Sequence, residues 1–196
     1  MARGNQTRTL RIIGGTWRGR TWRFPEGGIR PTPDRVRETL FNWLAPVIAG
    51  ARCLDLFAGS GALGLEALSR GAARVVFVEQ AAAAARDLRR TLDSFGDGQA
   101  AAAHVHTGDA LGYLAGRSER FDVVFLDPPF AGPLLEAAAA RLESGAWLVP
   151  QARIYAECAA RGGLPPLPAG WQVLKAGRAG EVGYHLLEHS QAPSGP

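Results

Sequence analysis

The chain has 196 residues, 46% of them hydrophobic and 20% charged, and it contains two cysteines. This is long enough to bury the core of one globular domain. Two cysteines are too few for a disulfide framework or a cysteine-rich zinc site, so we expect buried thiols. No apolar stretch is long enough to cross a bilayer, and none follows the basic N-terminus as in a signal peptide, so we expect a cytoplasmic protein with no membrane contact.

Charge is unevenly distributed along the chain. Residues 1–37 contain nine arginines and two acidic residues, a local net charge of +7, whereas the whole chain carries +4. A basic arm on an acidic body favours a polyanionic partner. Trp17, Trp22 and Phe24 lie among these arginines, and guanidinium and aromatic groups together suit phosphate contact and base stacking. Alternatively, the aromatic side chains fasten a β-hairpin to the body.

The predicted elements alternate in chain order. Two short strands, 10–13 and 21–24, flank a glycine-rich segment and predict a hairpin. Thr32, as N-cap, and Pro33 then form a helix start. Further strands are predicted at 53–57, 74–79, 101–106, 121–126 and 154–157, and helices at 62–70, 81–94, 109–115 and 134–142. The runs 171–175 and 184–188 predict a closing antiparallel hairpin.

Several of these strands are continuous apolar runs, as at 75–78 and 123–126. Strands of this kind are covered on both faces, and their alternation with helices predicts a doubly wound, mostly parallel α/β sheet. We therefore expect a basic hairpin and helix extension over 1–45, a catalytic domain over 46–189 and a flexible tail over 190–196.

A glycine motif links the strand 53–57 to the helix that follows. Within residues 55–64 the glycines form the pattern G-x-G-x-x-G, which lets a nucleotide approach the backbone closely. Glu79 ends the next strand and can accept both ribose hydroxyls, an arrangement that fits NAD equally well. Asp55, however, would repel a pyrophosphate and suit the ammonium group of an amino acid. The motif therefore predicts S-adenosylmethionine, with Asp109 near its adenine or acting as a helix N-cap.

A second motif, Asp127-Pro128-Pro129-Phe130, follows the strand 121–126 beside the nucleotide crevice. The prolines fix an extended turn with outward carbonyls. Hydrogen bonds from an exocyclic base amine to the Asp127 carboxylate and the Pro128 carbonyl would orient the nitrogen lone pair. Phe130 would stack on the base. The alternative is a rigid turn with a structural aspartate.

Four segments in this order resemble the bacterial RsmD-type methyltransferases, which modify the 2-amino group of the guanine numbered 966 in 16S ribosomal RNA. They are residues 11–20, residues 30–44, the glycine motif extended to Arg70, and the second motif. The resemblance implies a class I, Rossmann-like methyltransferase with a seven-stranded sheet, S-adenosylmethionine as cofactor and no metal. It also implies 16S rRNA as partner, within a small ribosomal subunit or an assembly intermediate; we expect a monomer.

The expected site residues fall into three groups. The catalytic residues are Asp127, Pro128 and Phe130. The cofactor-binding residues are Asp55, Phe57, Gly59, Gly61, Glu79, Asp109 and Thr32. The RNA-binding residues are Arg11, Trp17, Arg18, Arg20, Arg23, Arg30 and Arg37. Two other functions stay open: an adenine-N6 methyltransferase of DNA or RNA, whose motif usually begins with Asn, and a non-catalytic RNA-binding ribosome assembly factor.

Overall fold

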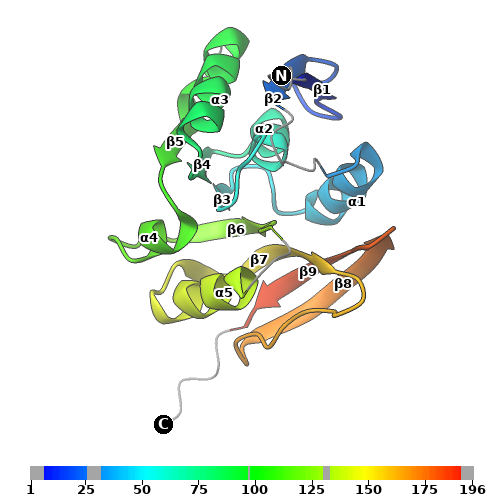
Figure 1. The fold of residues 1–196 in the computed structure, drawn as a ribbon, viewed down its shortest axis with the longest axis vertical. Helices are drawn as coiled ribbons and strands as arrows, with labels where there is room; N and C mark the ends of the chain where they lie inside the picture. The colour runs from blue at the N-terminus through cyan, green and yellow to red at the C-terminus, as the bar shows by residue number, and fades with distance from the viewer. Residues whose placement is uncertain (1–6, 26–31, 97, 130–132, 191–196) are drawn as a thin grey trace, which may run out of the picture.

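The computed structural model describes residues 7–25, 32–96, 98–129 and 133–190 (Figure 1). The helices are α1 Asp34–Leu44, α2 Ala62–Ser69, α3 Ala82–Phe95, α4 Ala110–Leu114 and α5 Leu134–Ser144, with a short 3-10 helix at Ala100–Ala102. The strands are β1 Thr7–Arg11, β2 Thr21–Pro25, β3 Arg52–Asp55, β4 Arg74–Glu79, β5 Ala103–Thr107, β6 Phe121–Leu126, β7 Leu148–Ala159, β8 Trp171–Ala179 and β9 Val182–His189. None of the helices in these ranges is long and apolar enough to cross a membrane.

One seven-stranded sheet has the strand order β5-β4-β3-β6-β7-β9-β8. Strands β5, β4, β3, β6 and β7 are parallel, whereas β9 is antiparallel to both of its neighbours. The chain leaves β3 toward β4 and β5 and then returns to add β6 on the other side of β3. This confirms the predicted doubly wound sheet with an antiparallel C-terminal hairpin, and it places a topological switch point between β3 and β6.

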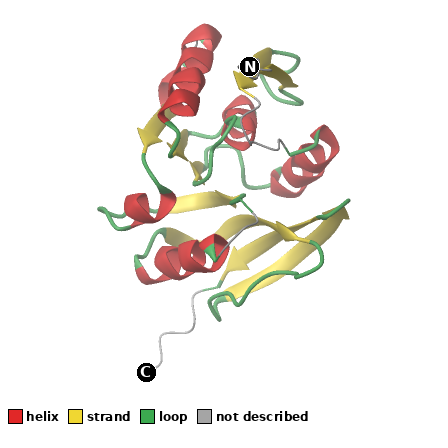
Figure 2. Cartoon of the chain, in the orientation of Figure 1, coloured by secondary structure: helices red, strands yellow, loops and turns green. Residues whose placement is uncertain are grey.

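The central strands β3, β4 and β6 are covered on both faces, which explains their apolar sequences (Figure 2). Successive residues point to opposite faces: Cys53 belongs to a hydrophobic cluster formed with α1, α2 and α3, and Leu54 to a second cluster formed with α4 and α5. On β6, Phe125 belongs to the first cluster and Leu126 to the second. These clusters are the two halves of the core.

The N-terminal hairpin belongs to the first of these clusters. Its apolar residues are buried there: Leu10, Ile12, Trp17, Trp22 and Phe24. The Trp17 ring packs edge-on against Phe95 of α3, with 4.9 Å between ring centroids. The segment predicted as an extension therefore shares one core with the domain behind it, as expected if the aromatic side chains fasten the hairpin in place.

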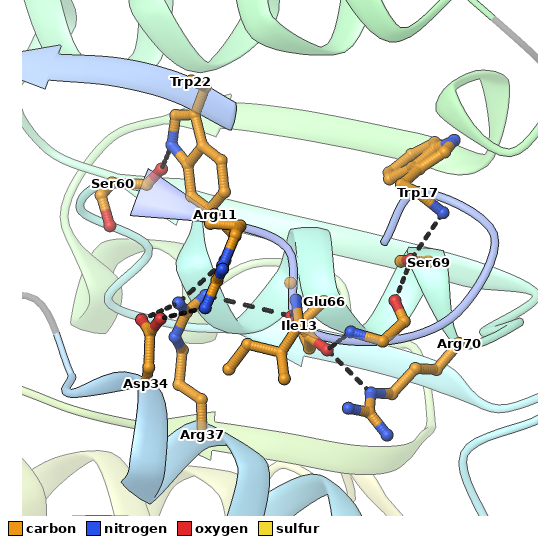
Figure 3. Close-up of polar contacts among 12 residues, drawn as sticks. Arg11, Ile13, Trp17, Trp22, Asp34, Arg37, Ser60, Glu66, Ser69 and Arg70 are labelled. Atoms are coloured by element: carbon orange, nitrogen blue, oxygen red, sulfur yellow. Dashed lines mark hydrogen bonds and ion pairs between the residues drawn. The ribbon is translucent and has the colours of Figure 1, made fainter. Parts of the chain in front are cut away.

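Buried polar contacts also join the hairpin to α2 (Figure 3). The Glu66 carboxylate accepts hydrogen bonds from the backbone N–H groups of Ile13 (2.9 Å) and Gly14 (2.8 Å) and from Nε of Arg70 (2.8 Å). The Ser69 hydroxyl accepts one from the backbone N–H of Trp17 at 3.0 Å. Because Glu66 is fully buried, these donors replace the water that its charge would otherwise require.

Candidate functional site

The candidate site lies at the carboxyl edge of the central strands. Asp55 ends β3, and it pairs with Phe77 of β4 on one side and with Phe125 of β6 on the other. Glu79 ends β4, and Asp127 follows directly after β6. Since parallel strands end at the same edge of a sheet, the three carboxyl groups surround the switch point.

The glycine turn of this site is shaped by close contacts. Gly61 adopts a φ of 77° at the N-terminus of α2, a left-handed conformation that favours glycine. A Cβ atom at Gly64 would lie 2.1 Å from the Phe77 ring, so only glycine lets α2 pack this closely on β4. The turn therefore holds the backbone N–H groups at the start of α2 next to the acidic edge.

Glu79 and Asp55 fix the conformation of this turn. The Glu79 carboxylate accepts hydrogen bonds from the backbone N–H groups of Gly59 (2.8 Å) and Ala81 (2.7 Å). The Asp55 carboxylate accepts one from the N–H of Gly64 at 3.0 Å. Each carboxylate has further lone pairs. Both groups can therefore accept hydrogen bonds from a ligand without releasing the loop.

The electrostatics of the site favour a cationic ligand. Burial raises the pKa of Asp55 from 3.8 to about 7; the hydrogen bond from Gly64 opposes this shift, and the nearby Glu79 charge adds to it. A buried carboxylate with a second carboxylate as neighbour is stabilised by a positive group. S-adenosylmethionine carries a sulfonium and an ammonium group, so the acidic residues present fit this cofactor.

Two other predicted cofactor residues border the same edge. Asp109 caps the N-terminus of α4, since its carboxylate accepts a hydrogen bond from the backbone N–H of Gly112 at 2.7 Å. This confirms the helix N-cap, one of the two roles considered for Asp109. Phe57 is partly buried against the cluster formed by α4 and α5.

Thr32 differs from its expected place in the fold. Helix α1 begins at Asp34 with Pro33 as its N-cap residue, and no side chain caps it. The predicted N-cap role of Thr32 is therefore wrong. Its hydroxyl oxygen instead lies 3.1 Å from Oε1 of Glu157 and 3.4 Å from Oδ2 of Asp127. The two carboxyl groups thus determine the orientation of the Thr32 side chain.

Asp127 occupies the end of β6 as predicted, in strongly acidic surroundings. Burial raises its pKa well above the ordinary value, and the charges of Glu157 and Asp55 raise it further; the hydrogen bond with Thr32 acts in the opposite direction. Pro128 is buried beside it, while Phe130 lies outside the described residues. The raised pKa makes Asp127 a better proton acceptor than an ordinary aspartate.

Glu157 is a site residue that the sequence analysis missed. It lies in β7, is 4% exposed, and accepts a hydrogen bond from the Tyr155 hydroxyl at 2.6 Å. The one signal in the sequence was an acidic residue at the end of the predicted apolar strand 154–157, where a charge is costly unless it has partners.

The predicted RNA-binding residues divide by exposure. Arg11, Arg18, Arg20 and Arg23 are exposed on the hairpin. Trp17 and Arg37 are in the interior, with exposures of 1% and 0%, so their burial contradicts the predicted contact with RNA. Arg30 lies outside the described residues.

Arg37 has a structural role instead. Its Nη2 donates hydrogen bonds to the backbone carbonyl of Arg11 (2.9 Å) and to Asp34 (2.7 Å), and its Nη1 lies 4.0 Å from Glu66. A fully buried guanidinium group with these partners cannot reach a phosphate at the surface. Arg37 therefore fastens α1 to the end of β1 (Figure 3).

Two further observations concern other parts of the structure. A hollow of about 330 Å³ lies at the opposite edge of the sheet, near Val47, Asp122 and Arg153, and includes none of the predicted site residues. In the part of the chain that the structure describes, no three His, Cys, Asp or Glu side chains are grouped to hold a metal ion.

The sheet order, the glycine turn and the acidic edge together define an S-adenosylmethionine-dependent methyltransferase with a Rossmann-like fold. Comparison with known proteins agrees: the family described as "Conserved hypothetical protein 95" matches residues 10–188. The chain belongs to this family, that of the RsmD methyltransferases.

Individual relatives cover most of the chain. Ribosomal RNA small subunit methyltransferase D of Escherichia coli is 48% identical over 180 residues, which are 91% of this chain and 89% of that protein. The Haemophilus influenzae protein of the same name is 44% identical over 187 residues, 92% of this chain and 94% of that one. The solved structure of Escherichia coli yhhF has a TM-score of 0.85 at 46% identity, covering 93% of this chain and 98% of that chain.

Proposed function

We propose that the chain transfers a methyl group from S-adenosylmethionine to the exocyclic 2-amino group of one guanine in small-subunit 16S rRNA, at the position numbered 966 in the family. The names of the relatives support a small-subunit rRNA substrate. One observation carries the choice of an amine: Asp127 and Pro128 follow β6 at the edge where Asp55 and Glu79 end their strands. Acceptors for N–H groups thus border the predicted cofactor site.

The residues that would hold the cofactor follow from the geometry of the edge. Glu79 has lone pairs for ribose hydroxyls, and Asp55 is a buried carboxyl group whose ionised form a cationic amino-acid end would stabilise. Gly59 and Gly61 let a ligand approach the backbone. When bound, S-adenosylmethionine supplies an electrophilic methyl group on a good leaving group. The task left to the protein is placement of the accepting nitrogen.

Asp127 and Pro128 would provide that placement. The lone pair of an exocyclic guanine amine is delocalised into the ring, so the nitrogen is a weak nucleophile. Hydrogen bonds from its two N–H groups to the Asp127 carboxylate and the Pro128 carbonyl would turn the lone pair toward the methyl donor. Asp127, whose pKa is raised, would then accept the proton that the amine loses.

Identification of the methylated nucleoside tests this function. The protein is incubated with labelled S-adenosylmethionine and deproteinised 16S rRNA, small ribosomal subunits or DNA, and the digested product is analysed by mass spectrometry. We expect N2-methylguanosine from an rRNA substrate. An N6-methyladenine product would favour the adenine methyltransferase alternative. If none of the three substrates were methylated, an enzymatic function would be contradicted.

A further inference from the structure

Glu157 lies next to Asp127 across the sheet. Leu126 of β6 pairs with Ala156 of β7, so the residues that follow, Asp127 and Glu157, are neighbours at the ends of paired strand segments. Glu157 is almost fully buried, and its charge acts on Asp127 more strongly than that of Asp55. Asp127, the residue proposed to hold the base amine, therefore lies next to a second buried carboxyl group.

Two hydroxyl groups of the described residues lie within hydrogen-bonding distance of these carboxyl groups. Tyr155 donates its single hydroxyl hydrogen to Oε1 of Glu157. The Thr32 hydroxyl lies within hydrogen-bonding reach of both Glu157 and Asp127, but it has one hydrogen and can donate fully to only one of them. Its second contact becomes a good hydrogen bond when the other carboxyl group is protonated and donates to the Thr32 oxygen.

Electrostatic repulsion also favours one proton on the pair formed by Asp127 and Glu157. Two ionised carboxylates in one desolvated place repel each other strongly, so such a pair retains one proton over a range of pH in which isolated carboxyl groups are ionised. Burial contributes most to the raised pKa of Asp127, and the charge of Glu157 contributes next. Geometry and charge thus both favour one proton for the pair.

We propose that Glu157 and Thr32 are positioning residues for methyl transfer: together with Asp127 they hold one shared proton, and they fix the Asp127 carboxyl group where the base amine docks. This inference rests on the proposed role of Asp127 in receiving the amine. Neither residue needs to touch the base. When the proton resides on Glu157, Asp127 is ionised and presents acceptor oxygens to the amine.

The pH dependence of methyl transfer tests the shared proton. Glu157→Gln removes the negative charge next to Asp127, so the pKa of Asp127 should fall toward its ordinary value. Under single-turnover conditions we expect the acidic limb of the rate profile to move to lower pH by about one unit or more. Glu181→Gln, the same change at an exposed position in the turn between β8 and β9, should leave the profile unchanged. A uniform loss of rate in Glu157→Gln without a shift of the limb would overturn the proposal.

The Thr32 hydroxyl is tested with two substitutions of similar size. Thr32→Val removes the hydroxyl group and should reduce the single-turnover rate, whereas Thr32→Ser keeps it and should restore the rate. Binding of S-adenosylhomocysteine, measured by isothermal titration, should be the same in Glu157→Gln as in the wild type. If Thr32→Val and Thr32→Ser behave alike, the hydroxyl does not position Asp127.

Thermal stability gives a readout that does not depend on activity. Because the native pair holds a proton more tightly than the unfolded chain, the melting temperature should fall as the pH rises through the range in which that proton is lost. Glu157→Gln and Asp127→Asn should each weaken this dependence, and the double variant should add little to either. Additive effects would contradict a shared proton. Full turnover in Asp127→Ala would contradict the proposed function. The melting temperatures of the two single variants and the double variant would still show whether Asp127 and Glu157 share a proton.

Discussion

Asp55 shows how one buried carboxyl group can make stability depend on pH. Its pKa is about 7 in the folded protein, against 3.8 for the ordinary group, so the native state holds the proton more tightly than the unfolded chain. The resulting stabilisation is complete below about pH 4 and is lost as the pH rises to about 7. A shift of this size corresponds to at most about 4 kcal/mol.

This predicts that the ligand-free protein becomes less stable as the pH rises from about 4 to about 7. Asp55→Asn keeps an oxygen for the N–H of Gly64 but cannot ionise, so its melting temperature should fall less over the same range. Thermal unfolding followed by circular dichroism at several pH values measures both slopes. Equal slopes in the two proteins would show that Asp55 does not titrate there.

Asp127 is predicted to matter for transfer and not for cofactor binding. Asp127→Ala removes the acceptor for the base amine, and we expect a loss of about a hundredfold or more in single-turnover rate. The affinity for S-adenosylhomocysteine, measured by isothermal titration, should be retained. Asp93→Ala, at an exposed position in α3, is the matched control. Unchanged turnover in Asp127→Ala would refute the assigned role.

Among the elements, the hairpin β1–β2 is a structural part of the domain. Trp22 of β2 is 6% exposed, and its Nε1 donates a hydrogen bond to the backbone carbonyl of Ser60 in the glycine turn at 2.9 Å. Glu66 and Ser69 of α2 accept hydrogen bonds from the backbone of the segment that follows β1. Loss of the hairpin would therefore expose part of the core and release the turn.

We expect Trp22→Ala to destabilise the protein by about 3–5 kcal/mol, because it leaves a cavity in the shared core and removes the hydrogen bond to Ser60. Arg23→Ala, one residue further along the same strand and exposed, should change the free energy of unfolding by less than about 0.5 kcal/mol. Urea unfolding of both variants measures the difference. Similar values for the two would place the hairpin outside the core.

For the whole molecule, the distribution of charge predicts where RNA binds. Arg18 and Arg23 are exposed on the hairpin, which is itself held to the glycine turn through Trp22. Phosphate contacts from the hairpin would therefore bring an RNA strand close to the edge that carries Asp127. Arg20 is oriented by its neighbours, since it donates a hydrogen bond to the Phe95 carbonyl at 2.8 Å and lies over the Phe95 ring.

The double variant Arg18→Gln and Arg23→Gln should weaken binding to 16S rRNA. Because up to two phosphate contacts are lost, the logarithm of the association constant should fall less steeply with the logarithm of salt concentration, and the slope should decrease in magnitude by about one to two. Affinity for S-adenosylhomocysteine should not change. Arg178→Gln, exposed on the edge strand β8, is the control. Filter binding at several salt concentrations measures the slopes; identical slopes for the variant and the wild type would place the RNA elsewhere.

The sequence alone determined the features that depend on neighbouring residues. Apolar strand runs, their alternation with helices and the glycine turn at residues 59–64 are local patterns. Together they predicted the elements of the domain and a doubly wound, mostly parallel sheet, whereas the strand order comes from the structure. Asp55, Glu79 and Asp127 were predictable for the same reason: each follows or ends a strand, and parallel strands bring their ends to one edge.

Only the tertiary structure decided which side chains meet across long separations in the chain. Thr32 and Glu157 are 125 residues apart, and Ile13 and Glu66 are 53 apart, so no local pattern indicates either contact. The same holds for burial: Arg37 and Trp17 belong to a basic, aromatic segment that looks exposed, but packing against α2 and α3 encloses them. Burial and partner choice depend on the complete packed core, and this is why the roles of these residues emerged from the fold.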